Sequence, residues 1–211
     1  MTIDAVVLDL GQVLVRWDPY GPFVGRMPVE RVEAFFADVD FPTFNHHQDA
    51  GRPWAQARAE VRARFPQHAA ALDLYVEHFA DALPGPVPGS EQLVRDLSEA
   101  GIRTLGLTNW SAETFHLAEP AAPSIGLLED VLVSGTVGLA KPDPRIFALL
   151  VRRFGLDPAS TVFVDDSPVN VDAATAAGLA GVLFTTADAL RADLRDRGVP
   201  LPAAGGDRPP A

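Results

Sequence analysis

Four short polar pieces of this 211-residue chain follow apolar, β-branched runs, and they are Asp9, Thr108-Asn109, Lys141-Pro142 and Asp165-Asp166. The carboxyl ends of parallel strands lie at one edge of an open sheet, so residues far apart in the sequence meet in a single crevice there. We therefore expect carboxylates, a hydroxyl, an amide and an amine to face one another at that edge.

The acidic side chains of this set need a positive partner. Two unit charges about 4 Å apart repel by roughly 4 kcal/mol at an effective dielectric constant near 20. Magnesium takes one or two carboxylates, waters and a substrate phosphate as oxygen ligands, and Lys141 adds a second positive charge. Such a site suits phosphoryl transfer, in which the catalyst positions an in-line attack and neutralises charge on the phosphate oxygens. A carboxylate nucleophile would form an aspartyl-phosphate, which water then hydrolyses.

Each piece on its own has an ordinary structural explanation. An aspartate after a strand is often a turn former or a helix cap, and a lysine is usually a solvated surface cation. The chemical interpretation depends on all four pieces lying in successive strand-to-helix connections of one sheet.

From residue 90 onward, short strands and helices alternate. We expect strands at 5–8, 102–107, 131–133, 161–164 and 181–184, and helices at 90–100, 111–118, 143–155, 167–178 and 187–196. This alternation predicts the α/β class, with a Rossmann-like parallel sheet and helices on both of its faces.

Residues 16–83 break the alternation. Helical periodicity at 29–39, 54–65 and 69–83, without a convincing strand, predicts an inserted all-helical cap. Residues 1–15 and 84–198 then form the α/β core, and the stretch rich in Pro, Gly and Ala at 199–211 is expected to be disordered.

Composition limits the partners. A formal net charge of −11 disfavours nucleic acid and anionic membranes, which are bound mainly by basic surfaces. The chain has no cysteine, which fits a reducing compartment, and no apolar run suited to a membrane span or a secretory leader. We expect a soluble cytoplasmic protein, and the sequence leaves its oligomeric state open.

The four pieces also resemble the motifs of a known family. The segments 9–13 (Asp-Leu-Gly-Gln-Val), 108–109, 141–144 and 165–167 resemble, as a set, those of the haloacid dehalogenase-like (HAD) hydrolase superfamily with a small helical cap. Within it, the chain is similar to cytoplasmic sugar-phosphate phosphatases and to the phosphatase domain of bifunctional epoxide hydrolases. The resemblance implies a magnesium-dependent phosphatase acting on a small phosphorylated metabolite, with a sugar phosphate as the candidate substrate.

The resemblance also implies a metal site. Asp9 would be the nucleophile and a magnesium ligand, and the backbone carbonyl of Gly11 would be a second ligand. Asp166 would be the third protein ligand, with Asp165 beside it or in the outer shell.

A phosphate site is implied in the same way. The Thr108 hydroxyl and the Asn109 backbone amide would hold phosphate oxygens. Lys141 would pair with both Asp9 and the phosphate.

One position departs from the family pattern. Most family phosphatases have a second aspartate two residues after the nucleophile, which protonates the leaving oxygen, whereas this chain has Gly11. General acid and base help is typically worth about 10²–10⁴ in rate. Asp18, His46 and His47 are candidate substitutes, although each is also an ordinary loop residue.

Two alternatives remain open, and a third disagrees with the order of the motifs. A 2-haloacid dehalogenase would use the same aspartate on carbon without a metal, but would gain nothing from Asp165-Asp166. A non-catalytic phosphate-binding relative would explain Gly11. A phospho-acceptor receiver domain would place the paired acids after the first strand, which is the reverse of the order here.

Overall fold

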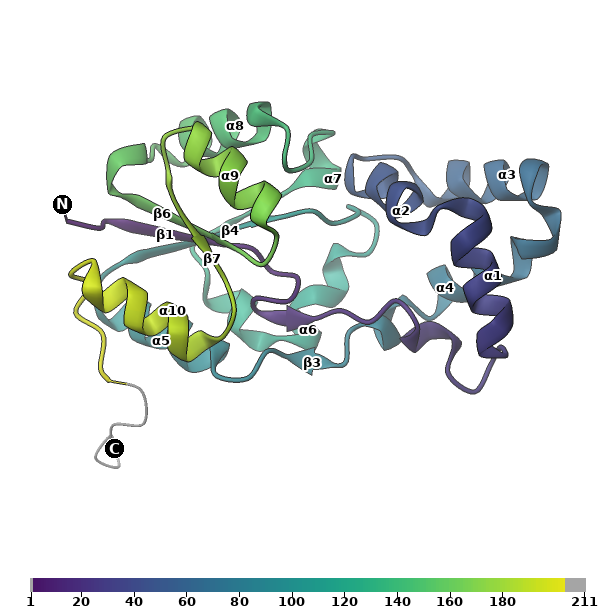
Figure 1. Cartoon of the computed structure of the whole chain (residues 1–211), viewed down its shortest axis with the longest axis horizontal. Helices are drawn as coiled ribbons and strands as arrows, with labels where there is room; N and C mark the ends of the chain where they lie inside the picture. Colours follow the sequence, from purple (N-terminus) through teal and green to yellow (C-terminus); the bar gives the residue numbers. More distant parts are fainter. Residues whose placement is uncertain (1, 204–211) are drawn as a thin grey trace.

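The computed structural model describes residues 2–203 and has two lobes (Figure 1). The larger lobe holds a five-stranded parallel sheet in the order β5-β4-β1-β6-β7. The strands are β1 (Ala5–Leu8), β4 (Arg103–Thr108), β5 (Val131–Val133), β6 (Thr161–Asp165) and β7 (Ala180–Leu183). Successive strands are added to one side of β1 and then to the other, so the strand order reverses next to β1, where ligands bind in folds of this kind.

Burial on both faces explains the nearly unbroken apolar strands. Val6 packs into the cluster on one face of the sheet, and Val7 packs into a separate cluster on the other face. Alternate residues of a strand point to opposite faces, so both residue sets must be apolar when helices cover both sides. The predicted α/β fold is confirmed.

Helices cover the two faces as expected. In Figure 1, α8 (Pro144–Phe154) and α9 (Pro168–Ala176) lie above the sheet, and α5 (Ser90–Glu99) and α10 (Ala187–Asp196) lie below it. The core lobe also contains α6 (Ala118–Ala121) and α7 (Ser134–Val137). Asp143 caps α8 by accepting a hydrogen bond from the backbone of Arg145, as the Asp-Pro start signal predicts.

Four helices form the smaller lobe, which we call the cap: α1 (Val29–Val39), α2 (Phe41–Asp49), α3 (Trp54–Arg64) and α4 (Ala69–Glu77). Two chain crossings join it to the core, and they pair as the antiparallel strands β2 (Val15–Arg16) and β3 (Gly85–Pro86). Short 3-10 helices complete the chain at Gly21–Phe23, Pro66–His68, Phe79–Ala82, Phe115–Leu117, Pro123–Leu127 and Pro158–Ser160.

The structure differs from the sequence-based expectations in three places. Helix α2 lies where no helix was expected, and the expected helix at 111–118 is a turn followed by a 3-10 helix and the short α6. At the start of the tail expected to be disordered, Val199 and Leu201 are buried against the core, because two apolar side chains there can cover α10. Residues 204–211 of that tail lie outside the described residues.

No helix within residues 2–203 combines the length and apolar character that a membrane crossing requires.

Candidate active site

Strand register brings the first and last acidic pieces together. Leu8 pairs with Val164 across β1 and β6, so Asp9 and Asp165 follow side by side. The backbone N–H of Asp9 donates to the Val164 carbonyl at 2.8 Å, which continues the ladder one residue past the end of β1. Residues more than 150 positions apart are therefore neighbours at this edge of the sheet, as the sequence predicts.

Lys141 lies at the centre of this edge and is buried, with 1% of its surface exposed. Its Nζ donates to the Leu107 carbonyl at 3.0 Å and to Oδ2 of Asp165 at 2.6 Å, and it lies 2.9 Å from Oδ1 of Asp9. Burial alone would lower the pKa of Lys141, but the charges of Asp9 and Asp165 outweigh that effect and raise it. An ammonium group has three donors, and all three are in use here.

The backbone of Lys141 is fixed by Asn109. The Asn109 side chain donates from Nδ2 to the Lys141 carbonyl at 2.9 Å and accepts at Oδ1 from the Lys141 N–H at 2.8 Å. This reciprocal pair ties the end of β4 to the loop that carries the lysine. The Asn109 side chain thus positions the cation, which leaves its backbone amide as the group proposed for the phosphate.

The two adjacent aspartates have different surroundings. Asp165 is fully buried, and its Oδ1 accepts from the Ser167 N–H at 2.9 Å and from Nδ2 of Asn170 at 3.0 Å. Its other oxygen is bound to Lys141. Asp166 is exposed and lines the pocket described below, where burial of part of the group and the nearby charge of Asp165 raise its pKa. Asp166 is therefore the more accessible candidate ligand, and Asp165 holds Lys141 and the start of α9.

The carboxylates fit a divalent ion. One oxygen each of Asp9, Asp165 and Asp166 can be chosen so that all lie within 4.8 Å of one another. Magnesium binds oxygen ligands at about 2.0–2.1 Å, so ligands on opposite sides of the ion are about 4.2 Å apart. Gly11 lines the same pocket, and its backbone carbonyl stays the predicted further oxygen ligand. The donor set therefore suits magnesium with small adjustments.

Magnesium should stabilise the folded protein measurably. Binding to the native state alone raises the midpoint of thermal unfolding by roughly 5–10 °C when the ion is at about 100 times its Kd. We expect Asp166→Asn to lose at least half of this shift, because it removes a charged oxygen ligand from the accessible side. Differential scanning calorimetry with and without magnesium measures the effect. Asp172→Asn, an exposed carboxylate on α9, is the matched control and should keep the full shift.

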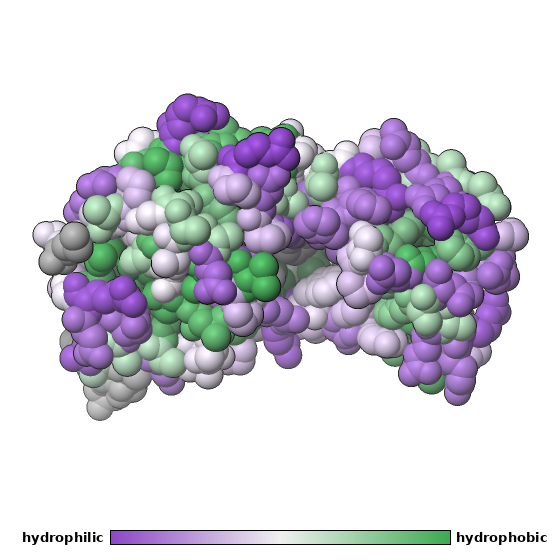
Figure 2. Space-filling model, turned by 45° about the horizontal axis from the view of Figure 1, so that its top comes forward, coloured by the Kyte–Doolittle hydropathy of each residue, from purple (hydrophilic) through white to green (hydrophobic). Residues whose placement is uncertain are grey.

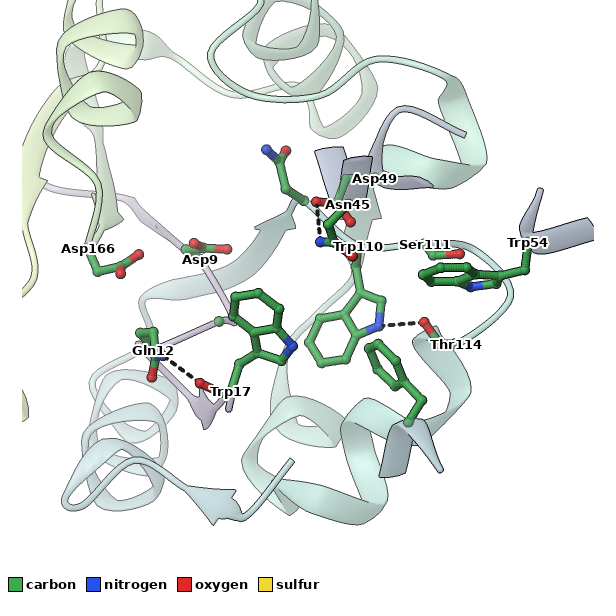
Figure 3. Close-up of a pocket in the computed structure, with 13 residues that line it drawn as sticks. Asp9, Gln12, Trp17, Asn45, Asp49, Trp54, Trp110, Ser111, Thr114 and Asp166 are labelled. Carbon is green, nitrogen blue, oxygen red and sulfur yellow. Dashed lines mark hydrogen bonds between the residues drawn. The ribbon is translucent and has the colours of Figure 1, made fainter. Parts of the chain in front are cut away.

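A pocket of about 240 Å³ opens above this site, between core and cap. Figure 2 shows the hollow between the two lobes, and Figure 3 shows the side chains around it. Its floor carries Asp9 and Asp166. Its walls are strongly aromatic, with Trp17, Trp54, Phe79 and Trp110. Of the described residues that line the pocket, none is Lys, Arg or His.

The model of the haloacid dehalogenase-like hydrolase family matches residues 3–178 of the chain, a range that contains the whole cap, the core lobe as far as α9 and all four sequence motifs. The chain belongs to the haloacid dehalogenase-like hydrolases. The implied family membership is thereby confirmed.

The chain is also similar to curated relatives in sequence and to solved structures in fold. A sesquiterpene phosphatase of Aspergillus oryzae is 26% identical over 204 residues, which cover 92% of this chain and 96% of that protein. Flavin mononucleotide hydrolase 1 of Arabidopsis thaliana is 30% identical over 111 residues, or 53% of this chain; the match spans about half of that protein, 45% of its length. A HAD family enzyme of Bacteroides thetaiotaomicron, solved as a magnesium complex, superposes with a TM-score of 0.72 at 20% identity, covering 92% of this chain and 100% of that one.

The cap of this haloacid dehalogenase-like hydrolase contributes polar groups that sequence reasoning missed. Asn45 and Asp49 line the pocket from α2, and Nδ2 of Asn45 lies 3.3 Å from Oδ2 of Asp49. Burial, with the charge of Asp9 as the next cause, raises the pKa of Asp49 to about 7. The signal for α2 is the spacing of Phe41, Phe44 and Gln48, its buried residues, at intervals of three and four.

Other predicted residues lie elsewhere. Thr108 ends β4 in a buried position and does not line the pocket, so its assignment to the phosphate stays a prediction. Asp18, His46 and His47 are exposed and lie outside the pocket lining. The Asp18 side chain accepts from the Tyr20 N–H at 2.9 Å, which is the role of a turn former.

Burial also perturbs the proposed nucleophile. It raises the pKa of Asp9 to about 7, against the opposing charge of Lys141. A buried carboxylate next to another carboxylate is costly to ionise, and a bound cation removes that cost. The hydrolase therefore holds Asp9 in a setting where it gains from a divalent ion.

Proposed function

We propose that the chain is a magnesium-dependent phosphatase that cleaves a small phosphorylated metabolite through an aspartyl-phosphate on Asp9. The observation that carries this proposal is the convergence of Asp9, Lys141, Asp165 and Asp166 at one sheet edge, where Asp9 and Asp166 line the pocket and the buried Lys141 and Asp165 lie behind them. A dehalogenase acting on carbon would have no use for the carboxylate of Asp166 facing Asp9.

The residues divide the work as follows. Asp9 attacks phosphorus in line with the departing oxygen, and Lys141 holds Asp9 in place and offsets negative charge around it. We assign the metal to Asp9, the Gly11 carbonyl and Asp166, with Asp165 oriented behind them; magnesium, when bound, would neutralise charge on the phosphate oxygens. The Asn109 backbone amide and the Thr108 hydroxyl are the proposed phosphate donors.

The pocket walls favour an apolar or planar group on the phosphate. The partly exposed Trp17 and the buried Trp54, Phe79 and Trp110 line the pocket with apolar surface, whereas a sugar needs many polar partners. The names of two relatives, a flavin mononucleotide hydrolase and a sesquiterpene phosphatase, describe substrates of this kind. We therefore place an aromatic or isoprenoid monophosphate ahead of the sugar phosphate expected from the sequence. We further propose a cytoplasmic setting, which the cysteine-free composition fits.

A panel of substrates tests both the phosphatase activity and the preference for apolar or planar substrates. Purified protein is assayed for phosphate release from 4-nitrophenyl phosphate, 1-naphthyl phosphate, an isoprenyl monophosphate, flavin mononucleotide and glucose 6-phosphate. Each substrate is assayed with magnesium and with a chelator. We expect metal-dependent release, with kcat/KM higher for the apolar and planar substrates by at least about tenfold, since burying one methylene group is worth about 0.8 kcal/mol.

Two outcomes would change this assignment. Halide release from a 2-haloacid in the presence of the chelator would favour the dehalogenase instead. Binding of phosphate compounds without turnover of any of them would favour a non-catalytic relative.

A further inference from the structure

The pocket has no side chain that could donate a proton at position 11, beside Asp9. Gly11 lines the pocket beside Asp9, and a Cβ added there would meet no heavy atom within 4 Å. A departing alkoxide is a poor leaving group until it is protonated, so a phosphatase acting on an alkyl ester needs an acid within reach. The open space at Gly11 means that this acid must come from elsewhere.

Three described carboxylates line the pocket: Asp9, Asp49 and Asp166. Asp9 is bound to Lys141, and Asp166 belongs to the carboxylate cluster proposed to hold the metal. Asp49 is neither paired with Lys141 nor part of that carboxylate cluster. It belongs to the cap, and its side chain lies on the cap side of the pocket (Figure 3). It therefore lies on the side of the pocket toward which the leaving group must depart when Asp9 attacks from the floor.

We propose that Asp49 is the general acid and base of this hydrolase, a role supplied from the cap because position 11 carries no side chain. The inference rests on the proposed phosphatase function. It assigns Asp49 a direct contact with the oxygen of the leaving group.

The surroundings of Asp49 suit a group that carries a proton. Its partner Asn45 is a neutral amide, and the charged groups that act on it are Asp9 and Lys141 of the core. Tyr75 of α4, the titratable cap side chain that senses its charge, is buried and has its own pKa raised, chiefly by that burial. Because burial raises the pKa of Asp49 to about 7, a substantial fraction of the group is protonated near neutral pH.

The proposed steps balance in protons and bonds. In the first, the Asp9 carboxylate forms a bond to phosphorus, the bond from phosphorus to the ester oxygen breaks, and the Asp49 proton moves to that oxygen to release an alcohol. In the second, the Asp49 carboxylate takes a proton from water as the water oxygen attacks phosphorus. The acyl-phosphate bond breaks, inorganic phosphate leaves, and both carboxyl groups return to their starting states.

The test compares leaving groups within one variant. Wild-type protein and Asp49→Asn are assayed with magnesium on 2-naphthylethyl phosphate, whose alkoxide needs a proton, and on 4-nitrophenyl phosphate, whose anion does not. We expect Asp49→Asn to lose about 10²–10³ in kcat/KM on the alkyl ester and less than about tenfold on the aryl ester. The ratio of the two losses does not depend on the folded fraction, so a purely structural defect cannot produce it.

Two further variants sharpen the result. Gly11→Asp places a carboxylate in the open space beside Asp9, and in the Asp49→Asn background it should restore at least about tenfold of the alkyl-ester rate. Glu33→Gln removes an exposed cap carboxylate and should leave both rates unchanged. Equal losses on the two esters would overturn the role of Asp49 while leaving the phosphatase intact. Absence of metal-dependent hydrolysis of either ester by the wild type would overturn the proposed function and this inference with it.

Discussion

Asp9→Asn should reduce metal-dependent phosphate release by on the order of 10⁴-fold or more, because the carboxamide cannot form an acyl phosphate and removing a covalent nucleophile costs this much in other hydrolases. The change is nearly isosteric. It should also leave the free energy of unfolding unchanged or raised, since Asp9 is a buried carboxylate whose burial disfavours its charge. Steady-state kinetics on 4-nitrophenyl phosphate and chemical denaturation measure the two effects together.

The combination of lost activity and kept stability is the informative result. Glu33→Gln serves again as the control for the preparation, because its carboxylate is exposed on the cap. An Asp9→Asn protein that folds and still releases phosphate within tenfold of the wild type would sink the aspartyl-phosphate mechanism. Acid quenching of the wild type with labelled substrate should in turn trap phosphate on a peptide containing Asp9.

The second large effect concerns Lys141, whose replacement by methionine should lower the free energy of unfolding by about 3–5 kcal/mol and abolish activity. Methionine fills most of the volume but leaves Asp9 and Asp165 facing each other without a cation. The Leu107 carbonyl also loses its donor. Urea denaturation followed by circular dichroism measures the destabilisation.

The deficit of Lys141→Met should depend on pH in a definite direction. In the wild type, the pKa of Asp9 is already raised to about 7, above an unfolded value of about 3.9, and removing the ammonium raises it further. A group with a raised folded pKa disfavours folding above that pKa, and the penalty disappears as pH falls toward the unfolded value. The deficit should therefore be smaller at pH 5 than at pH 8. Adding Asp165→Asn should recover part of it, and a deficit independent of both changes would contradict the ion-pair explanation.

Much of the core site could be predicted from the sequence because its position depends on strand ends alone. Asp9, Asn109 and Asp166 follow apolar runs, and parallel strands bring such ends to one edge whatever the side chains in between. Strand order and register were not needed for that step. Strand ends alone do not separate the roles of Asp165 and Asp166, since these depend on which carboxylate turns toward Lys141; only the family resemblance implied that Asp166 is the ligand.

The cap contribution was missed for a different reason. Helix α2 is a short element that begins after Asp40, a non-glycine residue with φ of 50°, and its first turn contains Pro42. Its apolar stripe is too brief to separate from a loop by periodicity. Asp49 has no local signal at all, because its place in the pocket is set by how the cap meets the core.

Two backbone contacts between cap and core fix how the two lobes are placed. The backbone N–H of Trp54, the first residue of α3, donates to Oε1 of Glu113 in the core at 2.8 Å. A Cβ at Gly51, just before α3, would lie 3.2 Å from the Gly135 carbonyl, so the two lobes touch through bare backbone at this point.

The proposed nucleophile and the proposed proton donor lie in separate lobes, and the chain passes between these lobes through the paired strands β2 and β3. A substrate too large for the pocket would push the cap away from the core. Asp49 would then lie too far from the ester oxygen, while the phosphate would still be bound next to Asp9. We therefore expect larger substrates of a homologous series to bind about equally well but to react more slowly. KM should stay nearly constant across the series, and kcat should fall as the substrate becomes larger.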